Sequence, residues 1–127
     1  MSDEIRHNYF SGETLYACRF DTDGTVFLTD GSSSEAWGTG ASDADTYDVA
    51  LTEDGSGGHY VGDFDASGNI AAGVYQVAIY LQAGANPADS DVCIGQGEIS
   101  WDGTAEVTEL GISGEQAKAV NVYGPGE

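Results

Sequence analysis

Residues 70–81 read Ile70-Ala71-Ala72-Gly73-Val74-Tyr75-Gln76-Val77-Ala78-Ile79-Tyr80-Leu81, and this stretch decides the fold. Its residues alternate at the period of a β-strand that buries one face, and the buried set is Tyr75, Val77, Ile79 and Leu81. An Ala-Ala-Gly sequence lies at the entry to the strand, and Tyr75 stands two residues before the inward Val77. This is the local pattern of a tyrosine corner, in which a Tyr hydroxyl ties a strand to the preceding loop. The stretch therefore predicts an immunoglobulin-like β-sandwich.

The rest of the chain predicts more short strands and almost no helix. Strand patterns cover residues 13–20, 26–28, 47–51, 59–64, 91–101 and 104–110, with turn signals such as Asp21-Thr22-Asp23-Gly24 and Asp102-Gly103 between them. Gly95 and Gly97 predict a bulge where the inward set of the 91–101 strand changes. We expect an all-β fold, a single antiparallel β-sandwich of seven or eight strands with extended N- and C-terminal segments.

Three segments divide the 127 residues. Residues 1–11 read as a polar N-terminal arm, residues 12–110 as the sandwich and residues 111–127 as a C-terminal extension. In that extension the signals are mixed: 114–119 suits one helical turn and 120–123 suits a strand. The longest loop is expected over 30–45, where Trp37 is interpreted either as a lid over the open side of the core or as an exposed contact residue.

The charge excludes two classes of partner. The chain carries 22 acidic side chains against three cationic ones, with a formal net charge of -19. Nucleic acids and anionic membranes are bound through Lys and Arg, so we expect neither as a partner. The acidity suits a densely arrayed protein that must not aggregate, or a saline source, or weak cation sites. With no secretion signal expected, the two cysteines, Cys18 and Cys93, are predicted as free thiols, with an inter-sheet disulfide beside Trp37 as the alternative.

No pattern predicts catalysis. His7 and His59 have no partner at metal-ligand spacing, and no serine nucleophile motif is found. Asp21 and Asp23 resemble the opening of a calcium loop, but position five is Thr25 and position twelve is not Glu, so a plain hairpin is expected. We therefore predict a protein that is not an enzyme and has no cofactor, apart from weak Ca²⁺ or Mg²⁺ binding by loop carboxylates.

Several segments together resemble a pattern common in structural proteins of tailed phages. They are Tyr47-Asp48-Val49-Ala50-Leu51-Thr52-Glu53-Asp54-Gly55-Ser56-Gly57-Gly58-His59-Tyr60, Gly62-Asp63-Phe64, Ala72-Gly73-Val74-Tyr75 and Gly97-Glu98-Ile99-Ser100-Trp101-Asp102-Gly103. The resemblance covers about residues 15–105 and implies an Ig-like module in the head or tail of a phage particle. The acidity exceeds what this pattern normally carries, which again suggests a marine or saline host.

The sequence and the resemblance together lead to a virion protein made in the host cytoplasm, most simply a capsid decoration protein. Its expected partners are the major capsid protein or another virion protein, and further copies of itself in an oligomer or array. The candidate contact residues are Arg6, Tyr9, Phe10, Trp37, Val122 and Tyr123. The alternative is a tail or fibre module that binds a neighbouring tail protein, or a surface glycan through Trp37 with Tyr80 or Tyr47.

Overall fold

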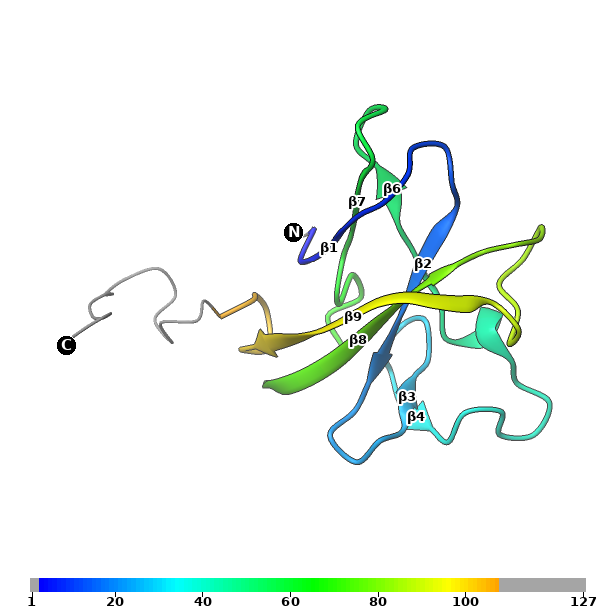
Figure 1. Ribbon diagram of the computed structural model, residues 1–127. Helices are drawn as coiled ribbons and strands as arrows, with labels where there is room; N and C mark the ends of the chain where they lie inside the picture. Colours follow the sequence, from blue (N-terminus) through cyan, green and yellow to red (C-terminus); the bar gives the residue numbers. More distant parts are fainter. Residues whose placement is uncertain (1–2, 108–127) are drawn as a thin grey trace, which may run out of the picture.

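A computed structural model describes residues 3–107, which form nine β-strands and one short 3-10 helix (Figure 1). In chain order these are β1 Ile5–Asn8, β2 Leu15–Phe20, β3 Val26–Phe27, β4 Ser34–Glu35, η1 Ala44–Thr46, β5 Val49–Ala50, β6 Thr52–Glu53, β7 His59–Gly62, β8 Gly73–Leu81 and β9 Val92–Trp101. Every strand pair is antiparallel. The predicted antiparallel all-β fold is therefore confirmed.

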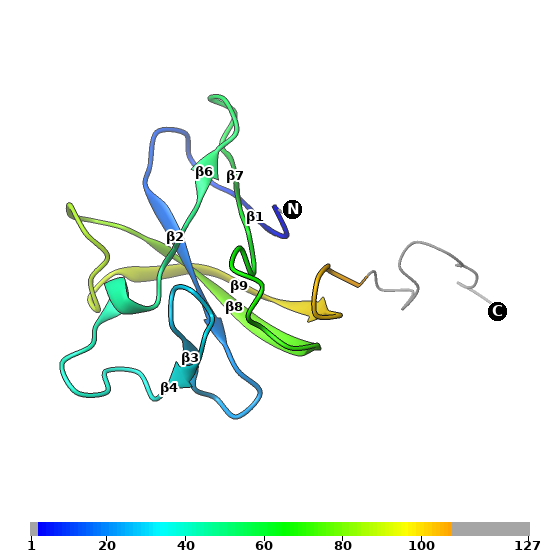
Figure 2. The same cartoon turned by 180° about the vertical axis from the view of Figure 1, so that it is seen from behind.

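The strands form two sheets. The larger has the order β4-β3-β2-β8-β9, with β5 also pairing with β2, and the smaller has the order β1-β7-β6. Figure 2 shows both from behind, with the long β8–β9 pair extending across the molecule. The chain passes from the larger sheet to the smaller one at Leu51, between β5 and β6. The strand predicted over 47–51 is therefore only β5, and β6 follows it directly in the other sheet.

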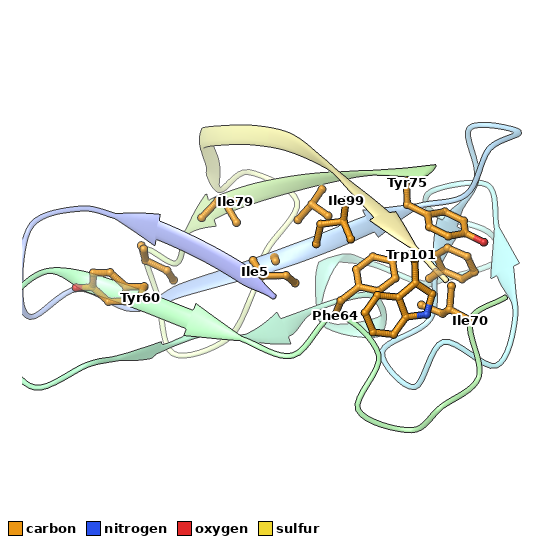
Figure 3. Packing of buried hydrophobic residues seen from close by; sticks show 12 residues of the cluster. Ile5, Tyr60, Phe64, Ile70, Tyr75, Ile79, Ile99 and Trp101 are labelled. Carbon is orange, nitrogen blue, oxygen red and sulfur yellow. The ribbon is translucent and has the colours of Figure 1, made fainter. Parts of the chain in front are cut away.

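The main core lies between the two sheets (Figure 3). The smaller sheet contributes Ile5 and Tyr60, while the larger sheet contributes the inward side chains of β2, β8 and β9. Aromatic rings close one end, where Phe64 lies 4.9 Å from Trp101 and 5.6 Å from Tyr75 between ring centroids. This arrangement is a β-sandwich-like structure, whose main core is formed by the inner faces of the two sheets.

A second apolar cluster covers the opposite face of the larger sheet. It consists of the buried residues Tyr16, Cys18, Val26, Ala44 and Tyr47, with Phe20, Leu28 and Tyr80 at its border. The segment between β4 and β5 contains η1 and covers this face through Ala44 and Tyr47. Because both faces of β2 are covered, five of its six residues are buried.

The N-terminal segment is part of the fold, which corrects the prediction of an arm over residues 1–11. Strand β1 pairs with β7 over four residues, from Ile5 opposite Gly62 to Asn8 opposite His59. Ile5 is buried in the main core. A strand with only one apolar anchor in four residues gives no alternation, so the sequence pattern read as a polar arm.

Two local predictions around β8 are confirmed. The Tyr75 hydroxyl donates to the Ala71 carbonyl at 2.7 Å, which is the hydrogen bond of the tyrosine corner. The register of β8 and β9 shifts between Ile79 and Tyr80, so that Ile94 has no direct partner opposite it. This is the bulge that the glycines in β9 predict.

Both cysteines are free thiols, as the sequence predicted. Cys18 lies on β2 and Cys93 on β9, so they belong to the same sheet and β8 runs between them. An inter-sheet disulfide beside Trp37 is therefore wrong. Burial and the nearby Asp48 carboxylate raise the pKa of the Cys18 thiol to about 12, whereas Cys93 is exposed.

Candidate functional site

The turn after β1 presents an aromatic side chain to solvent. Phe10 is 76% exposed and is the most exposed large apolar side chain of residues 3–107. Among the described residues, the aromatic ring paired with it is that of Tyr9, with ring centroids 5.3 Å apart in an edge-on arrangement. A phenyl ring this exposed gains little stability from the fold, but a single exposed apolar residue is common on protein surfaces, so exposure alone does not identify a site.

The backbone of this turn is fixed by hydrogen bonds on both sides of Phe10. Before it, the Tyr9 N–H donates to the Gly58 carbonyl at 2.8 Å. At Phe10 itself, the buried Tyr60 side chain donates its hydroxyl proton to the Phe10 carbonyl at 2.7 Å. After it, the Glu13 N–H donates to the same hydroxyl at 3.1 Å.

A carboxylate joins the turn to the neighbouring hairpin. Glu53 accepts hydrogen bonds from the Gly12 N–H at 3.0 Å and from the Gly58 N–H at 2.9 Å. Hydrogen bonds from the Ser11 side chain and from these two backbone groups lower the pKa of Glu53. The β1–β2 turn and the β6–β7 hairpin therefore form one rigid end of the molecule, at the top of Figure 1. We call this end, with Tyr9 and Phe10 on it, the aromatic turn.

The close packing at the aromatic turn requires glycine at position 58. Gly58 has a φ of +78°, and a Cβ atom there would lie 2.3 Å from the Tyr9 carbonyl oxygen. Any other residue would move the hairpin away from the turn. The sequence run Gly55-Ser56-Gly57-Gly58 predicted a break in the strand, but it did not indicate that one of its glycines positions Phe10.

Arg6 lies on β1, next to the aromatic turn. It is exposed, pairs with Val61 across the strands and lines an open hollow with Asp3, Asp54 and His59. The structure thus brings three of the predicted contact residues, Arg6, Tyr9 and Phe10, into one strand and the turn that follows it.

Trp37 belongs to another part of the surface. It follows β4 and covers the second cluster, with its ring 4.8 Å from Tyr47 and 6.5 Å from Phe20 between centroids. It remains 37% exposed. In Figures 1 and 2 the segment between β4 and η1 lies at the end opposite the aromatic turn. Trp37 is therefore a lid with one exposed side. The two remaining predicted contact residues, Val122 and Tyr123, lie outside the described residues.

Burial removes one of the three aromatic side chains that were proposed to stack on a glycan. Tyr47 is fully buried beneath Trp37, and its hydroxyl donates to the Glu35 carboxylate at 2.8 Å. Trp37 and the half-buried Tyr80, with ring centroids 6.4 Å apart and tilted by 45°, remain. Tyr47 cannot contact a sugar ring in this structure.

The carboxylates of the turns are held by local hydrogen bonds. Asp23 accepts from the Thr25 N–H at 3.0 Å and from its hydroxyl at 2.6 Å, and these bonds lower the pKa of Asp23. Within residues 3–107, no group of three or more His, Cys, Asp or Glu side chains has the geometry to hold a metal ion. No helix in this part of the chain is long and apolar enough to span a lipid bilayer.

One cation is buried, which the sequence did not predict. Arg19 is 1% exposed and lies on the inward face of β2. Its guanidinium donates to the carbonyls of Leu28 and Thr29, both at 2.8 Å, and to that of Phe64. Along the strand, Arg19 alternates onto the same face as Leu15 and Ala17, which lie in the main core. This alternation was the sequence feature that could have predicted the burial of Arg19. Because Arg19 is buried, its positive charge is absent from the surface, which is therefore even more acidic than the composition implies.

Comparisons with protein families, with curated proteins and with solved structures gave no match for this chain. The resemblance to tailed-phage structural proteins therefore stays a prediction from the residue pattern.

Proposed function

We propose that this chain is a non-enzymatic structural protein of a tailed-phage particle, a capsid decoration protein that binds the outer shell in many copies. The observation that carries the proposal is the aromatic turn, where a rigid backbone holds Phe10 76% exposed. We propose further that the sandwich is of the immunoglobulin-like type, which the tyrosine-corner hydrogen bond supports.

A rigid, protruding aromatic side chain suits a docking contact. Buried aromatic residues supply much of the binding energy at the centre of protein interfaces. Because the turn is already fixed by Tyr60 and Glu53, little backbone entropy is lost when Phe10 enters a pocket. Burial of the phenyl ring contributes about 2 kcal/mol per copy, and a shell with many sites needs no more than modest affinity from each contact.

The charge distribution fits the same role. Decoration proteins stand at high local density on a particle, where like charge keeps copies and particles from sticking to each other. This chain has 22 acidic residues and only three cations, of which Arg19 is buried. We propose that the partner is the major capsid protein or another virion protein, and that the protein is made in the host cytoplasm and located in the virion.

The second candidate is a tail or fibre module, and the exposed side of Trp37 favours it. This surface would bind a neighbouring tail protein, or a glycan through Trp37 and Tyr80. The two candidates use opposite ends of the molecule, so single substitutions separate them.

The test is co-sedimentation of the purified protein with particles from the source culture, from which the protein has been removed. Removal of residues 1–10 is not a clean test, because it removes β1 and the buried Ile5. Phe10→Ser keeps the strand, and we expect it to weaken binding about thirtyfold, which corresponds to about 2 kcal/mol. Val74→Ser is the matched control, since Val74 is 53% exposed on β8 and away from the turn.

Each outcome decides a different part of the proposal. Loss of binding with Phe10→Ser, but not with Val74→Ser or Trp37→Ser, supports docking through the aromatic turn. Loss with Trp37→Ser alone moves the contact to the opposite end and favours the tail module. No binding of the unchanged protein to any particle refutes the virion proposal itself.

A further inference from the structure

Four aspartates of this chain are followed directly by glycine. In such a pair the side-chain carboxyl carbon lies within reach of the next backbone nitrogen, and glycine has no side chain to hinder that nitrogen. The two groups can close a five-membered succinimide ring, which then opens to aspartate or isoaspartate. The four pairs are Asp23-Gly24, Asp30-Gly31, Asp54-Gly55 and Asp102-Gly103.

Three of the four carboxylates are held by their own turns. Each accepts a hydrogen bond from the backbone N–H group two residues ahead, and bonds from that residue lower the pKa of all three carboxyl groups. A carboxylate that stays ionised is a much poorer electrophile than a protonated carboxyl group. The donors are Thr25 to Asp23 at 3.0 Å, Ser32 to Asp30 at 2.9 Å and Thr104 to Asp102 at 2.8 Å.

Two of these three pairs are restrained at the glycine as well. The Gly24 N–H donates to the Asp21 carbonyl at 3.0 Å, and the Gly31 N–H donates to the Leu28 carbonyl at 2.7 Å. These bonds fix the peptide group whose nitrogen would attack. Ring closure at either pair therefore requires the hydrogen bonds of both reacting groups to break first.

The Asp54-Gly55 pair has neither restraint. Within residues 3–107, the Asp54 carboxylate and the Gly55 N–H take part in no hydrogen bond. Both residues are exposed, and a Cβ atom at Gly55 would meet nothing within 4 Å, so there is space for the ring and for water. The next two residues, Ser56 and Gly57, are also exposed, so little packing opposes the rotation that ring closure needs.

We propose that Asp54 is a site of spontaneous modification, which forms a succinimide with Gly55 and converts to isoaspartate faster than the other three Asp-Gly pairs. The Gly55 nitrogen bonds to the Asp54 side-chain carboxyl carbon, and the hydroxyl of the protonated carboxyl leaves as water with the proton of the nitrogen. Water then adds to either carbonyl of the ring, and the C–N bond at that carbonyl breaks. No electrons are transferred, and water is the only co-reactant. This chemistry is independent of the docking proposed for Phe10.

Isoaspartate at this position would lengthen the hairpin that holds the aromatic turn. Glu53 accepts from the Gly12 N–H at 3.0 Å, and the Gly58 carbonyl accepts from the Tyr9 N–H at 2.8 Å. In isoaspartate the main chain runs through the side-chain methylene group, which inserts an extra atom between Glu53 and Gly58. We therefore expect the modification to loosen the bond between Gly58 and Tyr9.

Ageing of the purified full chain tests the proposal. The protein is kept at pH 5 in water enriched in oxygen-18, and peptide mapping by mass spectrometry then locates isoaspartate and the oxygen taken up when the ring opens. We expect isoaspartate to form at Asp54 at least about fivefold faster than at any other Asp-Gly pair, because the others must first break hydrogen bonds. Asp54→Glu is the matched variant. It keeps the charge but would need a six-membered ring, so it should abolish the modification at this position.

The same incubation in guanidinium chloride is the control for the role of structure. In the unfolded chain the hydrogen bonds are lost, and the four pairs should isomerise at similar rates. Equal rates in the native protein, faster reaction at another pair, or the same preference for Asp54 in the unfolded chain would overturn the proposal.

Hydrogen exchange measures the consequence for the aromatic turn. The Tyr9 amide should exchange at least about fivefold faster in the isomerised fraction than in fresh protein. Unchanged exchange at Tyr9 would overturn the expected loosening of the turn.

Discussion

Replacement of Arg19 by Met tests whether the buried guanidinium holds the sandwich together. Arg19 connects β2 to three carbonyls, those of Leu28 and Thr29 in the loop after β3 and that of Phe64 after β7. No carboxylate forms an ion pair with it among the described residues, and burial lowers the pKa of its guanidinium. The charge is therefore stabilised by backbone dipoles and by the ring of Phe64, 6.0 Å away.

The magnitude follows from the groups left behind. Met fills similar space but leaves the carbonyls of Phe64 and Thr29 without this donor, and an unpaired buried acceptor costs about 1–3 kcal/mol. The Phe64 carbonyl is buried and takes the larger value, the Thr29 carbonyl is half-buried and takes about 1 kcal/mol, and the Leu28 carbonyl still accepts from the Gly31 N–H at 2.7 Å. The Met variant no longer has a charge buried away from water, which offsets part of this loss of stability. We expect Arg19→Met to lower the free energy of unfolding by about 3 kcal/mol, out of the roughly 5–15 kcal/mol that is usual for a domain.

The assay is urea unfolding at neutral pH, followed by the fluorescence of Trp101 in the core and Trp37 over the second cluster. Both signals should shift together to lower urea. Arg19→Lys is the matched control, because it keeps the charge but loses the planar guanidinium group. Its free energy of unfolding should lie between those of the unchanged protein and the Met variant. A Met variant as stable as the unchanged protein, or more stable, would refute the reasoning and show that the desolvation cost of Arg19 exceeds its hydrogen bonds.

Three more predictions concern single side chains. Tyr75→Phe removes the tyrosine-corner hydrogen bond and should lower the free energy of unfolding by about 1–1.5 kcal/mol in the same urea assay; no change would mean that the bond adds nothing. A thiol reagent at pH 8 should label one cysteine, the exposed Cys93, in the native protein and both in urea, whereas fast native labelling of Cys18 would contradict its burial. Burial raises the pKa of Asp91, but hydrogen bonds from two backbone N–H groups and the Tyr16 hydroxyl outweigh this and leave the pKa lowered. A lowered folded pKa stabilises the protein above the unfolded value of about 4, and this stabilisation is lost as the pH falls through the folded value. Asp91→Asn should therefore destabilise the protein at pH 7 and approach the unchanged protein in acid, and a constant difference in stability across this pH range would contradict the assignment.

The sequence predicted those parts of the fold that depend on local alternation and turn chemistry. The long strand with Tyr75, the bulge in β9 and the tight turn at Asp102-Gly103 all follow from residues close together in the chain, whereas the strand predicted over 104–110 is only a single bridge at Glu106 within the described residues. Strand β1 and the split of 49–53 between two sheets did not follow, because both depend on distant pairing, with β7 and β2 respectively.

The candidate site was predicted in part for the same reason. Phe10 and Tyr9 were selected from the sequence as apolar residues in a polar segment. Their rigid presentation depends on Tyr60, Glu53 and Gly58, which lie more than 40 residues away along the chain. Of the two interpretations of Trp37, the structure shows a lid, but over a second cluster on the outer face of the larger sheet rather than over the main core, and its role as a contact residue stays a prediction.

The central claim is that this protein decorates the outer shell of a phage particle, and immunogold electron microscopy of particles from the source culture tests it most directly. The antibody would be raised against this protein, and labelling would be compared between heads and tails. We predict gold spread evenly over the heads. Gold confined to tails, or particles without any label, would contradict the account.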